Sequence, residues 1–163
     1  MAESYPLQQI LQIKEKRLEE AEKTLIEKRN QLKEEEEQLL KLQKKRDEVK
    51  KHRDDKINQL KEELDEGTTS DKIEQAQRYL QVVDEKLLSR EKKVAEQKTK
   101  VKAAEEAVEE AKKEVLRKQV DIEKITIHKN SWTKEMKMEE ARIARVESDE
   151  LGSGMFVRRR KKK

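Results

Sequence analysis

The chain has 163 residues, of which 48% are charged, 32% hydrophobic and 2% aromatic, and it contains no cysteine. This composition excludes an ordinary globular core, which uses about 45–50% apolar residues. It also excludes disulfides and thiolate metal sites, in keeping with a reducing cytosol. The chain is therefore either a disordered polyelectrolyte or a long coiled coil, and the spacing of the apolar residues decides between the two.

Residues 5–66 are predicted to form the first helix. A leucine series with seven-residue spacing meets arginine twice before it returns to leucine, and a weaker companion series runs three residues on. This pattern indicates a coiled-coil seam with a polar interruption, and near residue 60 we expect the apolar series to slip by one position. The positions are Leu11, Leu18, Leu25, Leu32, Leu39, Arg46, Arg53 and Leu60, then Ala21, Leu42 and Val49, and at the slip Ile57 and Leu64.

Residues 67–70 are predicted to form a turn. Gly67 suits the left-handed position after a helix, because it has no Cβ to clash. Asp71, with Glu74 three residues later, suits the cap of the next helix. Thr68, Thr69 and Ser70 can satisfy exposed backbone groups between them. A connection this short makes the two flanking helices antiparallel.

Residues 71–150 are predicted to form the second helix. Ten of eleven positions at seven-residue spacing are apolar, which excludes disorder in so charged a sequence. The eleven are Ile73, Leu80, Leu87, Val94, Val101, Val108, Val115, Ile122, Lys129, Met136 and Ile143. We therefore expect an all-α fold, a long antiparallel two-helix coiled-coil hairpin in which helix two is longer than helix one.

The turn sets the register of this hairpin, so that residue i faces a position near 137 − i. The rule places Arg53 beside Asp84 and Arg46 beside Glu91. We predict that these two ion pairs bridge the polar interruption. At a solvent-flanked seam each adds about 0–1 kcal/mol but helps to fix register.

The second helix extends past the start of the first, so its last apolar residues have no partner within the chain. Such a stripe is a candidate docking surface. Alternatively, Trp132 closes the hairpin by packing on Tyr5, Pro6 and Leu7, and the overhang frays or pairs with a second copy. The predicted partner-binding residues are Tyr5, Leu7, Trp132, Met136, Ile143 and Val146.

Residues 151–163 are predicted to form a flexible basic tail, because Gly152 and Gly154 disfavour helix. The net charge of the chain is +4, and Arg158–Lys163 carries six positive charges, so the body is close to neutral. Such a tail attracts nucleic acid or an anionic membrane, which defines an alternative function as an adaptor. The body lacks the basic stripe typical of nucleic-acid binding, so nucleic acid is the weaker alternative.

No sequence motif for catalysis or nucleotide binding is present. His52 and His128 lie far apart on charged helices, where a histidine is usually solvated. A two-helix hairpin also lacks the dry pocket in which paired carboxylates act as acid and base. We expect no enzyme activity, no cofactor, no metal and, since no stretch approaches the required length, no membrane span.

Several segments resemble the YscO/FliJ family of type III secretion stalk proteins, particularly injectisome members from chlamydia-type bacteria. They are the opening YPLQQILQIKEKRLEEAEK, the turn LDEGTTSD, the late HKNSWTKE and the basic end. The resemblance implies a hairpin similar to the stalk of the rotary ATP synthase γ subunit. It also implies a place in the pore of the hexameric secretion ATPase, and links to the export gate protein and to secretion chaperones.

The resemblance further implies a monomeric protein in the cytoplasm, peripheral to the base of the secretion apparatus. The terminal end of the hairpin would face the ATPase and the turn end the gate, although the reverse polarity is the alternative. A third hypothesis is a generic dimerising scaffold. It would associate through apolar residues outside the seam, namely Ile13, Ile26, Leu40, Leu88 and Leu116.

Overall fold

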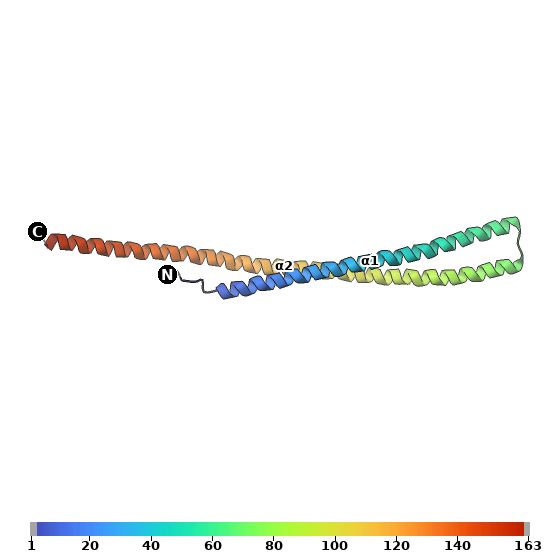
Figure 1. The fold of residues 1–163 in the computed structure, drawn as a ribbon, viewed down its shortest axis with the longest axis horizontal. Helices are drawn as coiled ribbons and strands as arrows, with labels where there is room; N and C mark the ends of the chain where they lie inside the picture. Colours follow the sequence, from blue (N-terminus) through green and yellow to red (C-terminus); the bar gives the residue numbers. More distant parts are fainter. Residues whose placement is uncertain (1–2, 162–163) are drawn as a thin grey trace. The chain divides into compact units, whose positions relative to one another are not determined.

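The computed structural model describes residues 3–161, and these form two long helices (Figure 1). Helix α1 is Gln8–Glu66, with 59 residues, and helix α2 is Ser70–Lys161, with 92 residues. Residues 67–69 connect them, and the described part of the chain contains no strand. The predicted all-α class, with a longer second helix, is confirmed.

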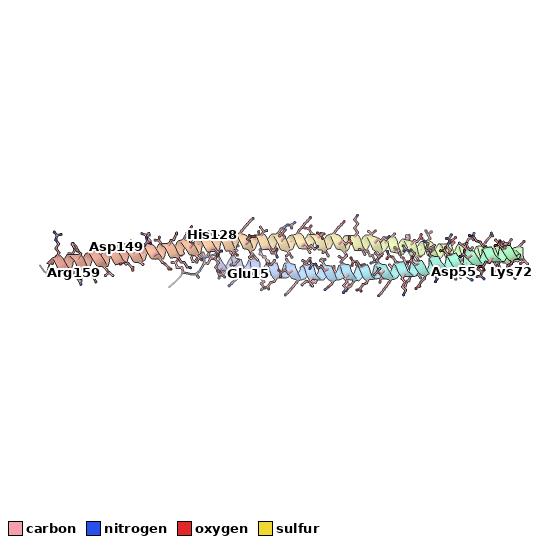
Figure 2. All side chains as sticks on the ribbon, turned by 90° about the horizontal axis from the view of Figure 1, so that it is seen from above. Glu15, Asp55, Lys72, His128, Asp149 and Arg159 are labelled. Carbon is pink, nitrogen blue, oxygen red and sulfur yellow. The ribbon has the colours of Figure 1, made fainter. Side chains whose placement is uncertain are left out.

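The chain divides into two compact units. The turn unit is Lys23–Lys113, and the terminal unit comprises residues 3–22 and 114–161 of the described chain. Within the turn unit, α1 and α2 lie side by side and antiparallel (Figures 1 and 2). Within the terminal unit, the beginning of α1 packs against residues 114–136 of α2.

A single apolar seam holds the turn unit together. The buried residues of α2 follow a three-then-four spacing, while the leucines of α1 on the facing seam remain half-buried. A Val or Ala is small enough for an opposing leucine to cover, whereas these longer leucine side chains keep part of their surface in solvent. The buried residues are Val83, Val94, Gln97, Val101, Val108 and Ala111.

The same spacing continues in the terminal unit, where Tyr5, Leu11 and Val115 are buried. Half-buried positions on α2 follow the spacing as far as Met136. Every residue from 137 to 161 is exposed. The seam thus ends about where α1 begins, and the last part of α2 has no helix against it.

The turn differs slightly from the prediction. Gly67 has a φ of +88°, the left-handed conformation that glycine adopts without strain. Helix α2 begins at Ser70, one residue earlier than predicted, because the Thr69 carbonyl accepts the first helical hydrogen bond, from Ile73 N at 3.2 Å. Asp71 therefore lies in the first turn, where a negative charge favours the helix dipole, and not at the cap.

Helix α1 begins three residues later than predicted. Pro6 has no N–H, and the Gln8 amide donates to the Tyr5 carbonyl at 3.1 Å in a turn that precedes the helix. The first α-helical bond joins Leu11 N to Leu7 O at 3.0 Å. Tyr5 and Leu7 thus belong to a lead-in segment and not to α1.

The predicted break at residue 151 is wrong, since α2 continues through Gly152 and Gly154 to Lys161. A glycine inside a helix costs about 1 kcal/mol relative to alanine, which lowers helix stability without forbidding the helix. Neither glycine has a positive φ, unlike Gly67. The cations of the last turn also favour the carboxyl end of the helix dipole.

Polar residues of the seam show where the register prediction holds. Arg53 donates to the Asp84 carboxylate, as predicted. Arg46 does not reach Glu91 but contacts the adjacent Asp47, with Nη2 and Oδ1 3.1 Å apart. A flexible guanidinium at a half-exposed position takes the nearest carboxylate, because an exposed ion pair is worth little.

The predicted slip of the apolar series near the turn does not occur. Leu64 is 49% exposed, and Glu63 occupies the half-buried seam position instead. Helix α1 keeps an unbroken heptad spacing, so it accepts polar residues in the seam and leaves Leu64 outside it.

A pair of valines provides a test of the seam. Val94 is 3% exposed and Val82 is 62% exposed, both on α2 in the turn unit. We expect Val94→Ala to lower the free energy of unfolding by about 1–2 kcal/mol, because it removes buried methyl groups. Val82→Ala should change it by less than about 0.5 kcal/mol. Urea unfolding followed by circular dichroism at 222 nm measures both, and equal effects would contradict the assigned seam.

Candidate functional site

The terminal unit is organised around Tyr5. Its side chain is 6% exposed, and its hydroxyl is hydrogen-bonded to His128 Nδ1 at 2.5 Å. The two ring centroids are 5.7 Å apart, with an interplanar angle of 49°. The segment before α1 is thereby attached to α2 through a hydrogen bond and a ring contact.

Trp132 forms the second contact of Tyr5. The ring centroids are 5.5 Å apart and the planes are tilted by 60°, a favourable aromatic geometry. Trp132 remains half-buried. The sequence-based alternative, in which Trp132 closes the hairpin on Tyr5, therefore matches the geometry of this unit.

Two polar contacts flank the aromatic cluster. Lys129 Nζ donates to Gln8 Oε1 at 2.8 Å, and Lys14 Nζ lies 3.8 Å from Asp121 Oδ2. Gln8 and Lys129 obey the predicted 137 − i relation, as do Tyr5 and Trp132. The beginning of α1 is thus held in a defined register on α2.

Beyond the cluster, α2 continues alone. Figure 2 shows α2 passing from His128 to Asp149 and Arg159 without a second helix beside its final stretch. We call residues 137–161 the unpaired stretch. It presents exposed apolar side chains of Met138, Ile143, Val146, Leu151, Met155, Phe156 and Val157.

The unpaired stretch carries an ion pair near its beginning and a cluster of positive charges at its end. Arg142 Nη2 lies 2.6 Å from Glu139 Oε1, one turn away. Hydrogen bonds from Arg142, and then its positive charge, lower the pKa of the Glu139 carboxyl, while the same contacts raise the pKa of the Arg142 guanidinium. This pair therefore stays ionised at neutral pH. Arg158–Lys161 makes the final turn strongly basic.

The six predicted partner-binding residues differ in their exposure to solvent. Tyr5 is buried by contacts within the chain, and Leu7, Trp132 and Met136 are half-buried. Ile143 and Val146 are 46% and 43% exposed and continue the seam spacing into the unpaired stretch. These two residues present the seam stripe to solvent.

Sequence reasoning missed the other exposed apolar residues of the unpaired stretch. Met138 lies outside the heptad series, so a search for seven-residue spacing passes over it. Leu151, Met155 and Phe156 lie in the segment that the sequence predicts to be a flexible tail, so spacing along a helix gives no expectation for them. Their apolar character next to the cations was the available signal.

The histidines are exposed, as expected on charged helices, but each is also hydrogen-bonded to a tyrosine. His128 bonds Tyr5, and His52 Nε2 is hydrogen-bonded to the Tyr79 hydroxyl at 2.6 Å in the turn unit. Both histidines are exposed, yet each is oriented by a tyrosine. Spacing within one helix could not show this, because each tyrosine lies in the opposing segment.

Among the described residues there is no group of three or more His, Cys, Asp or Glu side chains placed to hold a metal ion. Within residues 3–161, no helix is both long enough and apolar enough to cross a membrane.

Comparison with known proteins gave two matches and one negative result. Residues 2–162 match the model of the family described as YscO-like protein. A solved structure, described as that of a proposed YscO homolog from Chlamydia trachomatis, matches with a TM-score of 0.94 and 41% sequence identity. The match covers 99% of this chain and 100% of that chain. A search of curated proteins gave no match.

The Tyr5 contacts can be tested through Trp132, the single tryptophan. We expect Tyr5→Ala to expose the indole ring and shift its fluorescence emission to longer wavelength. Tyr5→Phe should retain most of the ring contact and give a smaller shift. Tyr79→Ala is the matched control, because Tyr79 contacts His52 and Lys56, and it should leave the emission unchanged. An unaltered spectrum in Tyr5→Ala would refute the aromatic cluster.

Proposed function

Because the chain belongs to the YscO-like family, we propose that it is a non-catalytic component of type III protein secretion. In this proposal it is a coiled-coil stalk that engages the hexameric secretion ATPase. It links that ATPase to the export gate protein and to secretion chaperones. It acts in the cytoplasm, peripheral to the base of the secretion apparatus. The family resemblance supports the secretion role.

The observation that carries the ATPase contact is the unpaired stretch of α2. Residues 137–161 are all exposed, although Ile143 and Val146 continue the stripe that is buried earlier in the helix. A helix with an apolar stripe fits a hydrophobic groove on a partner protein. We assign the ATPase contact to this stripe and the neighbouring half-buried Met136.

The Tyr5 cluster supports the same proposal. It fixes the start of α1 on α2 immediately before the unpaired stretch begins. A partner bound to the unpaired stretch is therefore attached to a part of the terminal unit in which α1 and α2 are packed together. A single helix at the axis of a ring presents one face at a time, so it biases otherwise identical subunits one after another.

A non-catalytic role agrees with the surfaces of the two helices. Catalytic acids and bases need a water-excluded site that separates their pKa values. The pKa values of Glu139 and Arg142 are shifted by their contact with each other on an exposed turn of α2. These two oppositely charged side chains lie one turn apart, and such a pair stabilises the helix.

The basic end supports a second candidate, an adaptor for an anionic membrane or nucleic acid. Phe156 and Met155 are exposed directly before the cations of Arg158–Lys161. The adaptor requires this end, whereas the stalk proposal assigns no role to it. Removal of residues 155–163 therefore separates the two functions.

The test of the stalk is ATP hydrolysis by the cognate hexameric secretion ATPase at increasing concentrations of this protein. We expect saturable stimulation that survives removal of residues 155–163. The double variant Ile143→Ser with Val146→Ser should weaken the apparent affinity about tenfold, because two apolar contacts worth about 1.4 kcal/mol together are lost.

The matched control lies on the same stretch of α2. Met138→Ser with Leu151→Ser removes two exposed apolar side chains outside the seam stripe. It should change the apparent affinity less than about twofold. No stimulation and no co-sedimentation with the ATPase would refute the stalk. Equal loss in both double variants would refute the assigned stripe.

A further inference from the structure

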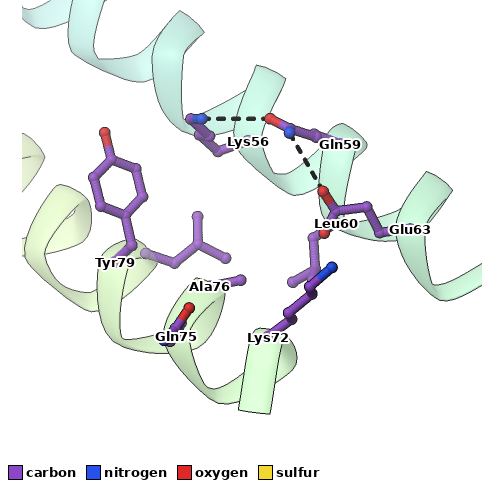
Figure 3. A pocket seen from close by; sticks show the side chains of 9 residues that line it. Lys56, Gln59, Leu60, Glu63, Lys72, Gln75, Ala76 and Tyr79 are labelled. Carbon is purple, nitrogen blue, oxygen red and sulfur yellow. Dashed lines mark hydrogen bonds between the residues drawn. The ribbon is translucent and has the colours of Figure 1, made fainter. Parts of the chain in front are cut away.

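Two shallow grooves lie between α1 and α2 in the turn unit, on the same side of the helix pair. Leu60 and Ala76 line the first (Figure 3), together with Leu80. Val49, Val82 and Val83 line the second. Both grooves therefore have an apolar lining, which in the first is rimmed by polar side chains such as Gln59 and Gln75.

Tyr79 lines both grooves and separates them. Its hydroxyl is held by His52 Nε2 at 2.6 Å, and the two rings meet edge to face with centroids 5.8 Å apart. Lys56 Nζ lies 5.6 Å from the centre of the tyrosine ring. These contacts orient the ring, yet the residue remains 45% exposed. An oriented, half-exposed tyrosine is the kind of side chain that anchors an interface.

A line of lysines runs along α2 through Tyr79. Lys72, Lys86, Lys93 and Lys100 share its seven-residue spacing and therefore its side of the helix. All four are exposed, and none takes part in an ion pair within the part of the chain that the structure describes. We call Lys72, Lys86, Lys93 and Lys100 the lysine line.

The opposite rim, on α1, carries a line of carboxylates, although Lys56 of α1 also lines the first groove. Glu48, Asp55 and Glu62 are exposed and also follow seven-residue spacing, and Glu48 lines the second groove beside Val49. Cations on α2 thus follow the line of Tyr79, and carboxylates on α1 follow a second line across the grooves, with Lys56 of α1 over the tyrosine ring.

We propose that this face of the turn unit binds one amphipathic helix of a partner protein. The helix lays an apolar stripe over Tyr79 and Val82, with carboxylates on its flank toward α2 and amines on its flank toward α1. It completes a three-helix arrangement over the two grooves. This interaction is separate from the ATPase contact and does not depend on it. The charge complementarity of the two rims selects this occupant and also sets its direction.

The probe is a fluorescein-labelled helical peptide of three heptads, with a leucine stripe, glutamates on one flank and lysines on the other. We expect fluorescence anisotropy to show saturable binding to the full chain that weakens as salt is added. Tyr79→Ala should weaken binding about tenfold or more, because it removes the aromatic anchor. Lys86→Glu with Lys93→Glu should weaken binding by a similar factor.

Matched controls lie on the same helix away from this face. Leu88→Ser and Lys98→Glu alter exposed residues close to Tyr79 and Lys100 without changing the grooves or the lysine line. Both should bind the peptide like the unaltered chain. A second peptide with lysines on both flanks should bind weakly to the unaltered chain and better to Lys86→Glu with Lys93→Glu. Such a crossed result isolates the charge pairing from any loss of folding.

Three results would overturn the proposal. One is absence of peptide binding to a chain that is fully helical by circular dichroism. Another is equal weakening by Lys86→Glu with Lys93→Glu and by Lys98→Glu. The third is a concentration-dependent dimer in sedimentation that Tyr79→Ala dissociates, because the occupant would then be a second copy. All these variants should still stimulate the ATPase, so failure here is distinguishable from failure of the stalk proposal.

Discussion

The structure depends on one narrow constraint, namely that apolar side chains recur every three or four residues and meet across two helices. With 48% of its residues charged, the chain has no second layer to bury. Within residues 3–161 no side chain is completely enclosed, and even Val94 keeps 3% of its surface exposed. Long helices in water are stabilised mostly by packing, so each paired segment depends on the segment that faces it. Stability is therefore spread along the seam and not concentrated in one core.

Polar residues within the seam specify the alignment of the helices more than they stabilise it. Gln97 is buried and donates to the backbone carbonyl of Glu35 at 3.0 Å and also to its carboxylate. Displacing either helix by one turn would bury the Gln97 amide without these acceptors, which costs about 1–3 kcal/mol. Arg53 and Asp84 act in the same way nearer the turn. An all-leucine seam would lack such penalties, because one leucine fits another equally well after a shift.

Much of the fold was predictable, because seven-residue spacing is a property of the sequence itself. The position of Gly67 indicated the turn, and the turn then placed Arg53 by Asp84 and Tyr5 by Trp132. The predictions of the fold were wrong at positions where the alternatives differ by a small free energy. Glycine disfavours helix, yet α2 passes through Gly152 and Gly154 because about 1 kcal/mol each does not decide the outcome. Arg46 contacts Asp47 and not Glu91, because an exposed ion pair contributes too little free energy to fix one partner.

The candidate site was harder to predict than the fold. Apolar spacing identified Ile143 and Val146. It could not show that the Tyr5 side chain is buried by its contacts with His128 and Trp132. It also could not show Tyr79 and Val82 as a surface, since their exposure depends on what the opposing helix leaves uncovered. Both cases require knowledge of contacts between segments far apart in the sequence, which periodicity within one helix does not contain.

The end of the seam at Met136 divides α2 into two regimes of local stability. Up to that residue, breaking a backbone hydrogen bond of α2 also disturbs packing against α1. Beyond it, only the helix itself and short-range pairs such as Glu139 with Arg142 oppose opening. Amide hydrogen exchange therefore has a boundary inside one continuous helix, with slow exchange on one side and fast exchange on the other. A protein that clamps the last turns would move this boundary toward the carboxyl terminus without altering the paired helices.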